Sequence, residues 1–349
     1  MKKIHDVIII GGGQSGLAVA YYLRRKGIDY LILDAEEGPG GSWRHYWESL
    51  RLFSPAQWSS LPGKLMQGGI SHYPSKNDVI NYLETYERHY KINIERPVLV
   101  EKVYYENKVY RIVTNKGEFR SWSIVSATGT FRNAEIFPEV EHQDIFEGEV
   151  LHSSSYVEPT PFIGKRVAII GEGNSGAQIL AELSQHSDTF WITKDEPDYL
   201  PDHVDGKYLF DAASQLYEAK RKGKSFIPPS LGHIVMVPSV KDARARGVLK
   251  HLPAMKGFTK TGIKLIDGSE YDVDIVIFCT GFSASIDYLK ELPLAFRHHK
   301  VDTRGTKSRE LPGLWMVGYG SWTGFASATL IGVGRSAKAT SNEIAEFLS

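Results

Sequence analysis

The chain has 349 residues, of which 42% are hydrophobic and 23% charged, and its 41 basic residues balance its 41 acidic residues. These values suit a globular protein of about two domains and exclude a disordered or fibrous chain. Because the net charge is zero, the chain lacks the long-range field of a general nucleic-acid binder, and we expect no nucleic-acid partner.

The sequence also argues against membrane, metal and dithiol chemistry. No stretch approaches the ~20 apolar residues of a membrane helix, and the apolar run 7–10 is too short for a signal peptide, so we expect a cytoplasmic protein with no membrane partner. The single cysteine, Cys279, forms neither a disulfide nor a CxxC pair within the chain, and its place at the end of an apolar run predicts an inert thiol. His298 and His299 lack further ligands at suitable spacing, so we expect no metal site.

The N-terminal residues predict a strand, a glycine-rich turn, a helix and a second strand. Residues 7–10 are apolar and β-branched, the turn 11–16 reads Gly-Gly-Gly-Gln-Ser-Gly, residues 17–26 have helical spacing, and residues 30–33 form the next strand. The pattern returns with a strand at 166–170, the turn Gly-Glu-Gly-Asn-Ser-Gly at 171–176, a helix at 177–183 and a strand at 189–192. The chain therefore repeats a whole βαβ unit.

Further apolar runs complete the layout. Strands predicted at 123–126 and 274–278 run into Ala127-Thr128-Gly129 and Cys279-Thr280-Gly281, and a strand at 313–318 precedes a helix from about residue 326 to 348. The predicted fold class is α/β with two dinucleotide-binding, Rossmann-like domains. We assign residues 1–158 and 276–349 to the first domain and residues 159–275 to a second domain inserted into it.

Each glycine-rich turn has the spacing GxGxxG between a strand and a helix. The first glycine permits the tight turn, the second removes the Cβ atom that would block a pyrophosphate, and the third lets the helix pack on the strand. An isolated GxGxxG is weak evidence, but the strand and helix context predicts a dinucleotide site at each copy. Two such sites in one chain suggest electron transfer from one cofactor to the other.

The residue that ends the second strand separates the two copies. Asp34 stands 23 residues after Gly11, where a carboxylate can bind a free ribose diol, and Lys194 stands 23 residues after Gly171, where a cation can hold a 2′-phosphate. The first copy therefore suits FAD or NAD, and the second favours NADP. The alternative is that Lys194 is a solvated loop lysine, since Asp195 and Glu196 follow it.

A resemblance to a known family rests on several motifs in their order. Phe146, Gly148, His152 and Tyr156 resemble the fingerprint FxGxxxHxxxY of class B flavin-containing monooxygenases. The two GxGxxG turns, the Gly-Gly-Ser-Trp at 40–43, and the turns at 127–129 and 280–282 are similar to that family too. Residues 322–329 and 242–247 resemble its bacterial branch of metal-resistance-associated flavoproteins.

The resemblance implies FAD in the first domain and NADPH in the second. It implies a C4a-hydroperoxyflavin that oxidises a small nitrogen- or sulfur-containing substrate with molecular oxygen. Two departures stand out: Baeyer–Villiger enzymes usually carry Trp in place of Tyr156, and the Asn that classical members place beside the flavin is missing. Ser54 or Gln57 could act as the polar neighbour instead.

The predicted site residues follow from these motifs. Gln57 and Trp322 are the catalytic candidates. For the FAD site we expect Gly11, Gly13, Ser15, Gly16, Asp34, Ala35, Gly41, Ser42, Trp43, Gln57, Val98, Ala127, Thr128, Gly129 and Gly318. For the NADPH site we expect Gly171, Gly173, Asn174, Ser175, Gly176, Thr193, Lys194, Thr280 and Gly281.

Two other functions stay open at this stage. One is an NADPH-dependent flavin reductase that passes electrons to a quinone, a metal species or a partner protein. The other is a non-catalytic redox sensor that holds the cofactors as ligands. The sequence also leaves open the identity of the substrate and the oligomeric state. It is compatible with a homodimer.

Overall fold

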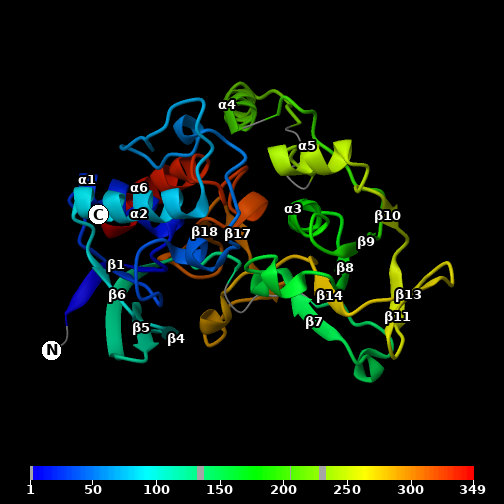
Figure 1. Ribbon diagram of the computed structural model, residues 1–349. Coiled ribbons are helices and arrows are strands. Elements are labelled where there is room, and N and C mark those ends of the chain that lie inside the picture. The colour runs from blue at the N-terminus through cyan, green and yellow to red at the C-terminus, as the bar shows by residue number, and fades with distance from the viewer. Residues whose placement is uncertain (1–2, 132–136, 205, 228–232) are drawn as a thin grey trace.

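The computed structural model describes residues 3–131, 137–204, 206–227 and 233–349, and its two largest sheets belong to two units that lie side by side (Figure 1). We call them the first unit and the second unit. In the part of the chain described, nine strands form the first unit's sheet, in the order β17-β18-β19-β6-β1-β2-β3, with the hairpin β4–β5 attached to β6. Their bounds are β1 Ile4–Ile10, β2 Tyr30–Leu33, β3 Ile94–Glu95, β4 Val100–Glu106, β5 Val109–Thr114, β6 Gly117–Ser126, β17 Thr303–Arg304, β18 Lys307–Ser308 and β19 Leu314–Met316.

The central strand β1 of the first unit is buried on both faces. Val7 and Ile9 pack against helices α1 (Gln14–Arg25), α2 (Lys76–Tyr90) and α6 (Val333–Leu348), whereas Ile8 and Ile10 face a second apolar cluster that includes β4 and β5. This period-2 alternation is why a run of four apolar residues forms a central strand between two cores. Parallel pairing of β1 with β2 and β6 brings the carboxyl ends of all three strands to one edge.

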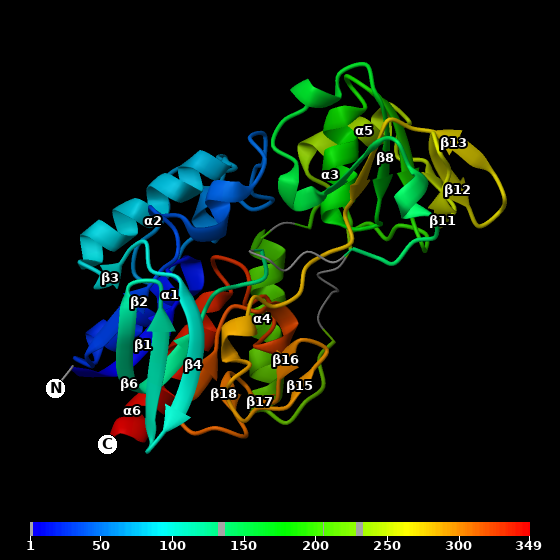
Figure 2. The same cartoon turned by 90° about the horizontal axis from the view of Figure 1, so that it is seen from below.

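The second unit repeats this design on a smaller sheet, in the order β10-β9-β8-β14-β7, with every pair parallel. Its strands are β7 Glu149–His152, β8 Arg166–Ile170, β9 Asp188–Ile192, β10 His251–Leu252 and β14 Ile275–Phe278. Helices α3 (Asn174–Leu183) and α5 (Pro238–Ala245) cover one face, and a small sheet of β11 (Met255–Phe258), β12 (Gly262–Leu265) and β13 (Glu270–Asp272) covers the other (Figure 2).

Helix α4 (Gly206–Arg221) stands in sequence between strands β9 and β10 of the second unit but lies beside the first unit (Figure 2). The Arg335 guanidinium of α6 donates to the Ser214 hydroxyl of α4 at 2.5 Å. A short hairpin, β15 (Phe296–Arg297) with β16 (Lys300–Val301), completes the strands. No helix in the described parts of the chain has the length and apolar character needed to span a bilayer.

The predicted strands 30–33 and 166–170 coincide with β2 and β8, and both helices after the glycine turns begin earlier than predicted, at Gln14 and Asn174. The C-terminal helix begins at Val333, so the predicted start near residue 326 is wrong. The reason is local backbone conformation: Gly324 and Ala326 have φ values of 137° and 57°, which a right-handed helix cannot contain.

The sheets also bear on the domain boundaries. Strand β7 precedes residue 158, yet it pairs with β14 in the second unit's sheet, and β14 lies almost wholly within the predicted return segment 276–349. We therefore propose that the chain enters the second unit before Glu149 and leaves it after Phe278. Strand runs of this kind look alike in sequence, so the sequence did not reveal which sheet would take them.

A stability test follows from the glycine turn of the second unit. A Cβ atom on Gly176 would stand 2.3 Å from the Gly171 carbonyl oxygen, whereas a Cβ on Gly173 would meet nothing within 4 Å. We expect Gly176→Ala to lower the free energy of unfolding by about 1–3 kcal/mol, because two backbones must separate. Gly173→Ala, the matched control, should unfold within about 0.5 kcal/mol of the parent in a urea titration. Equal stability of the two variants would contradict this packing.

Candidate active site

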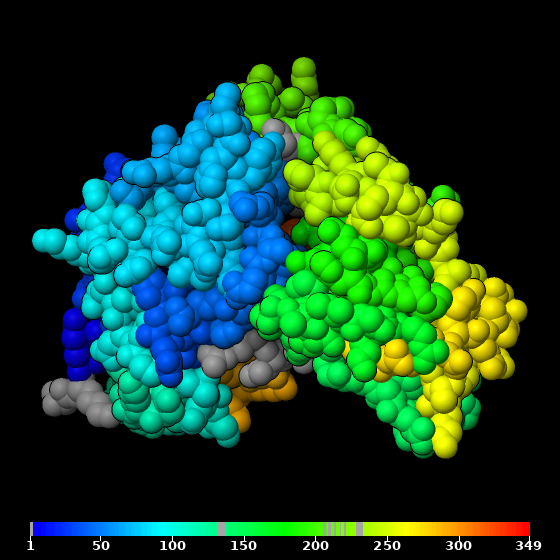
Figure 3. Space-filling view, in the orientation of Figure 1, coloured from blue at the N-terminus to red at the C-terminus, as the bar shows by residue number. Residues whose placement is uncertain are grey.

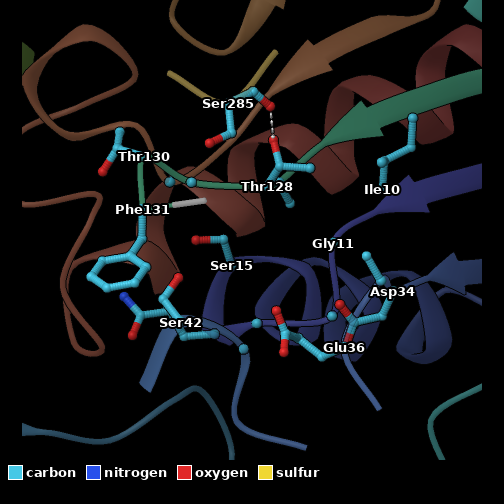
Figure 4. A pocket seen from close by; sticks show the side chains of 18 of the residues that line it. Ile10, Gly11, Ser15, Asp34, Glu36, Ser42, Thr128, Thr130, Phe131 and Ser285 are labelled. Atoms are coloured by element: carbon cyan, nitrogen blue, oxygen red, sulfur yellow. Dashed lines mark hydrogen bonds between the residues drawn. The ribbon is translucent and has the colours of Figure 1, made fainter. Parts of the chain in front are cut away.

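A cavity of about 430 Å³ opens at the carboxyl ends of β1, β2 and β6 (Figure 4). We call it the first cavity. Of the residues predicted for FAD, it is lined by Gly11, Gly13, Ser15, Asp34, Ala35, Gly41, Ser42, Trp43, Val98, Ala127, Thr128, Gly129 and Gly318. The structure therefore brings together residues from six separate stretches of the chain.

The glycines of the first turn have distinct physical roles. Gly11 has φ +105°, and a Cβ there would lie 2.6 Å from the Ala127 carbonyl oxygen. A Cβ on Gly16 would lie 2.0 Å from the Gly11 carbonyl oxygen, so Gly16 supports packing and does not line the cavity. A Cβ on Gly13, at the start of α1, would meet only the Gly41 Cα atom, 3.9 Å away. This open approach to a helix N-terminus fits a pyrophosphate.

Asp34 is held by a partner that the sequence analysis missed. The Arg96 Nε atom donates to the Asp34 carboxylate at 2.6 Å, and its two terminal nitrogens donate to the two Glu87 carboxylate oxygens at 2.7 Å each. All three side chains are about nine-tenths buried. Arg96 thus fixes the orientation of the carboxylate at the cavity, and no sequence spacing links residues 62 positions apart.

Other lining residues were missed as well. Glu36, Phe131, Ser285 and Tyr288 line the first cavity, and Thr128 donates its hydroxyl hydrogen to the Ser285 carbonyl oxygen at 2.7 Å (Figure 4). The Tyr288 hydroxyl lies 2.5 Å from Ser126 Oγ. Because Ser285 and Tyr288 enter from a segment more than 150 residues after Thr128, only the fold shows that they belong to the site.

The second glycine turn has the same form. Gly171 has φ +134°, with the Cys279 carbonyl oxygen 2.5 Å from the position of a Cβ atom, and Gly173 faces open space. The side chain of Asn174 is used within the protein: it donates to the His233 carbonyl oxygen at 3.0 Å and accepts from the Val235 amide at 2.8 Å. The side-chain amide of Asn174, one of the predicted NADPH residues, therefore holds the loop at residues 233–235 in place.

The remaining predicted NADPH residues surround that turn. Thr193 is buried, with its hydroxyl 3.0 Å from His251 Nδ1, whereas Lys194 is exposed at the end of β9, where a 2′-phosphate reader is expected. Thr280 and Gly281 lie just after β14, separated from it by Cys279. The Gly281 carbonyl oxygen lies 3.1 Å from His152 Nε2.

The fingerprint residues join the ends of the second unit's strands. The Ser154 amide donates to His152 Nδ1 at 3.2 Å, so in the neutral ring the hydrogen lies on Nε2 and points to the Gly281 carbonyl oxygen. The Tyr156 hydroxyl donates to the Glu182 carboxylate at 2.7 Å, and burial raises the pKa of that tyrosine. A Cβ on Gly148 would lie 2.5 Å from the Asp274 carbonyl oxygen. These contacts position β7 and the turn after β14.

A second cavity, of about 550 Å³, adjoins the first and shares Trp43, Tyr46 and Ala328 with it. Most of its lining is apolar or aromatic, with polar groups at intervals. The residues that contribute to this character are Leu52, Phe53, Ser54, Trp58, Leu216, Phe325, Leu330, Ile331 and Arg335. A mostly apolar cavity with a few polar groups is typical of a small-molecule site.

Two catalytic candidates lie elsewhere. Gln57 is exposed on a short 3-10 turn and lines neither cavity. Trp322 also lines neither; its ring packs 5.1 Å from Tyr319, and its Nε1 atom donates to the Val301 carbonyl oxygen at 3.2 Å. Ser54, the other polar neighbour considered from the sequence, is buried and lines the second cavity. The 3-10 turn Ala56–Trp58 leaves Gln57 exposed while Ser54, just before it, lines the cavity, and the sequence did not indicate this turn.

Cys279 is the chain's single cysteine and takes no part in either cavity. Burial raises the pKa of its thiol to about 12, so the thiolate form is scarce at neutral pH. This agrees with the predicted inert thiol and leaves redox chemistry to bound cofactors.

Comparison with known proteins assigns the chain to a family. Residues 8–209 match the family described as pyridine nucleotide-disulphide oxidoreductase. The chain is 30% identical to an uncharacterized CzcO-like oxidoreductase of Geobacillus kaustophilus, over 99% of both chains. It is 26% identical to the probable indole-3-pyruvate monooxygenase YUCCA8 of Arabidopsis thaliana, over 90% of this chain and 84% of the relative.

Solved structures agree. The flavin-containing monooxygenase of Stenotrophomonas maltophilia is 44% identical, superposes with a TM-score of 0.90, and is covered completely, as is this chain. A bacillithiol disulfide reductase of Staphylococcus aureus, at 19% identity and a TM-score of 0.73 over 99% of both chains, shares the fold. These matches confirm the predicted α/β fold class with Rossmann-like units and the resemblance to flavin-containing monooxygenases.

The first cavity generates a test of FAD binding. Gly13→Val adds a side chain where the nearest protein atom to the new Cβ, the Gly41 Cα, lies at an ordinary contact distance of 3.9 Å, so the variant should fold and yet obstruct the pyrophosphate. An obstruction of about 3 kcal/mol weakens binding about a hundredfold, and the protein should purify colourless. The matched Gly173→Val protein should stay yellow and bind NADPH weakly. Full FAD occupancy in Gly13→Val, measured by absorbance after denaturation, would overturn the assignment.

Lys194 generates a test of coenzyme choice. If its ammonium binds the 2′-phosphate, that charge-assisted contact would contribute roughly 1.5–3 kcal/mol, so Lys194→Ala should lose about ten- to a hundredfold in NADPH efficiency while NADH efficiency changes little. The control is Lys260→Ala, an exposed lysine paired with Glu147. If the ratio of the two efficiencies is the same in both variants, another residue reads the phosphate.

Proposed function

We propose a function on the premise that this chain belongs to the pyridine nucleotide-disulphide oxidoreductase family. It is an FAD-dependent NADPH oxidoreductase of the flavin monooxygenase type, so the predicted cofactors and enzyme class are confirmed. We infer that its substrate is a small molecule with an oxidisable nitrogen or sulfur atom. This molecule and molecular oxygen would react at the same site.

The observation that carries the proposal is the junction of the two cavities. Trp43, Tyr46 and Ala328 line both, so a molecule in the second cavity lies next to a cofactor in the first. Trp43 is fixed there because its Nε1 atom donates to the Gln14 side-chain oxygen at 3.0 Å, and Gln14 in turn donates to the Ala328 carbonyl oxygen at 2.6 Å. These two hydrogen bonds fix Trp43 and Ala328 relative to each other at the junction of the two cavities.

The cofactors supply the chemistry and the protein supplies the enclosure. When bound and reduced, FAD supplies oxygen activation, and our finer proposal is that the oxidant is the C4a-hydroperoxyflavin. The residues of the second cavity would orient the substrate and exclude water, with Phe53 and Phe325 providing apolar surface and Ser54 a polar contact.

A flavin reductase is the second candidate, and one observation favours it. The exposed side chain of Gln57 is not at the first cavity, so it does not replace the amide that classical monooxygenases place beside the flavin. A reductase needs no long-lived oxygen intermediate, and its electrons would pass to a quinone, a metal species or a partner protein. The single buried cysteine argues against dithiol transfer within the chain.

A stopped-flow experiment separates the two. When the NADPH-reduced protein meets oxygen, we expect a flavin-peroxide absorbance band before full reoxidation, because a monooxygenase must protect this species from water until the substrate arrives. Ser54→Ala should shorten the lifetime of this band several-fold, since it removes a polar group from the second cavity, whereas Gln57→Ala should leave it unchanged. Direct reoxidation, with peroxide released in proportion to NADPH consumed across a panel of amines and sulfides, would support the reductase.

A further inference from the structure

The segment 43–50 connects the first cavity with the second unit. Trp43 and Tyr46 line the cavity, and Trp47, immediately after them, is buried in the apolar core of the second unit, with its ring 6.4 Å from that of Tyr156. The Glu48 amide donates to the Val157 carbonyl oxygen at 2.9 Å. In the space-filling view the medium-blue N-terminal surface lies directly against the green surface of the second unit (Figure 3).

One buried charge holds this segment from the first unit. Lys76 begins helix α2, and its ammonium donates to the Tyr46 carbonyl oxygen at 2.8 Å and pairs with the Glu48 carboxylate through a short contact. Its side chain is 8% exposed, whereas that of Glu48 is 55% exposed. Lys76 therefore bonds the residue before Trp47 and the residue after it.

The position of Lys76 is unfavourable in isolation. Burial removes water from an ammonium group, and a cation in the first helical turn opposes the helix dipole. The helix does not need Lys76 for its cap, because Ser75 and Asp78 form a complete capping box. The two contacts to segment 43–50 are what offset these costs, and they place the charge where it fixes that segment.

We infer that Lys76 is a positioning residue for electron transfer from NADPH to FAD. By holding Tyr46 and Glu48, it sets the path between the first cavity and the contact of Trp47 with the second unit. This keeps the two cofactor-binding units in the relation that hydride transfer requires, and Lys76 itself touches no reacting atom. The inference rests on the proposed use of both cofactors and not on oxygen insertion.

The test is the anaerobic reduction of FAD in the Lys76→Met holoprotein. Met keeps the length and apolar stem but lacks the ammonium, so segment 43–50 should loosen. We expect reduction by NADPH to slow about ten- to a hundredfold, because a misplacement of roughly 1 Å has effects of this size. Reduction by dithionite, a small reductant that needs no second unit, should be unchanged, and so should FAD content. Hydrogen exchange at the Glu48 amide should be faster.

Further variants make the result decisive. Lys102→Met is the matched control, since Lys102, on strand β4, forms an exposed pair with Glu291. This variant should reduce normally. Lys76→Arg should restore part of the rate. Trp47→Leu weakens the contact of segment 43–50 with the second unit but leaves the Lys76 ammonium paired. This variant should show the same slow reduction, and it tests the inference even if Lys76→Met fails to fold. Normal reduction and normal exchange in Trp47→Leu and in any folded Lys76→Met protein would overturn the inference. A failure of oxygen insertion would leave these outcomes untouched.

Discussion

The close approach of helix α1 to strand β1 is the constraint on which the rest of the structure depends. A Cβ atom on Gly16 would stand 2.0 Å from the Gly11 carbonyl oxygen, so the two backbones touch where strand becomes helix. This contact places the helix N-terminus at the end of the parallel sheet, where its free amides meet the cavity. The second unit repeats this contact: a Cβ atom on Gly176 would stand 2.3 Å from the Gly171 carbonyl oxygen.

Sequence reasoning succeeded where a single local constraint decides the structure. The glycine turns and their flanking strands followed from spacing, because each depends on residues a few positions apart, and most of the residues predicted for FAD line the first cavity. It failed where distant segments meet. Arg96 reaches Asp34 across 62 positions, and β7 pairs with β14 across more than a hundred, so neither contact has a local signature.

The catalytic candidates show the same limit. Trp322 is a candidate because it lies in a motif that resembles the bacterial branch of the family. In the fold its ring packs against an apolar cluster beside Tyr319. Gln57 and Ser54 lie three positions apart, and only the path of the turn decides that Ser54 is buried at the second cavity while Gln57 is exposed. The identity of a residue type does not determine which way a loop presents it.

Contact between the units comes from more than one part of the chain. Phe131, after the first unit's turn, stacks 5.3 Å from Phe282, after the second unit's turn, and the Ser285 amide donates to the Gly129 carbonyl oxygen at 3.0 Å. Residues 129–131 and 282–285 thus run beside each other, and segment 43–50 adds a separate contact through Trp47. Together these contacts set the geometry in which one cofactor can reduce the other.

We propose that the protein inserts an oxygen atom into a substrate in the second cavity. The most direct measurement is mass spectrometry of a thioether product formed with NADPH under isotopically heavy oxygen gas. We expect a sulfoxide that carries the heavy isotope, in proportion to NADPH consumed. An unlabelled thioether recovered intact, with the heavy isotope only in hydrogen peroxide, would contradict it.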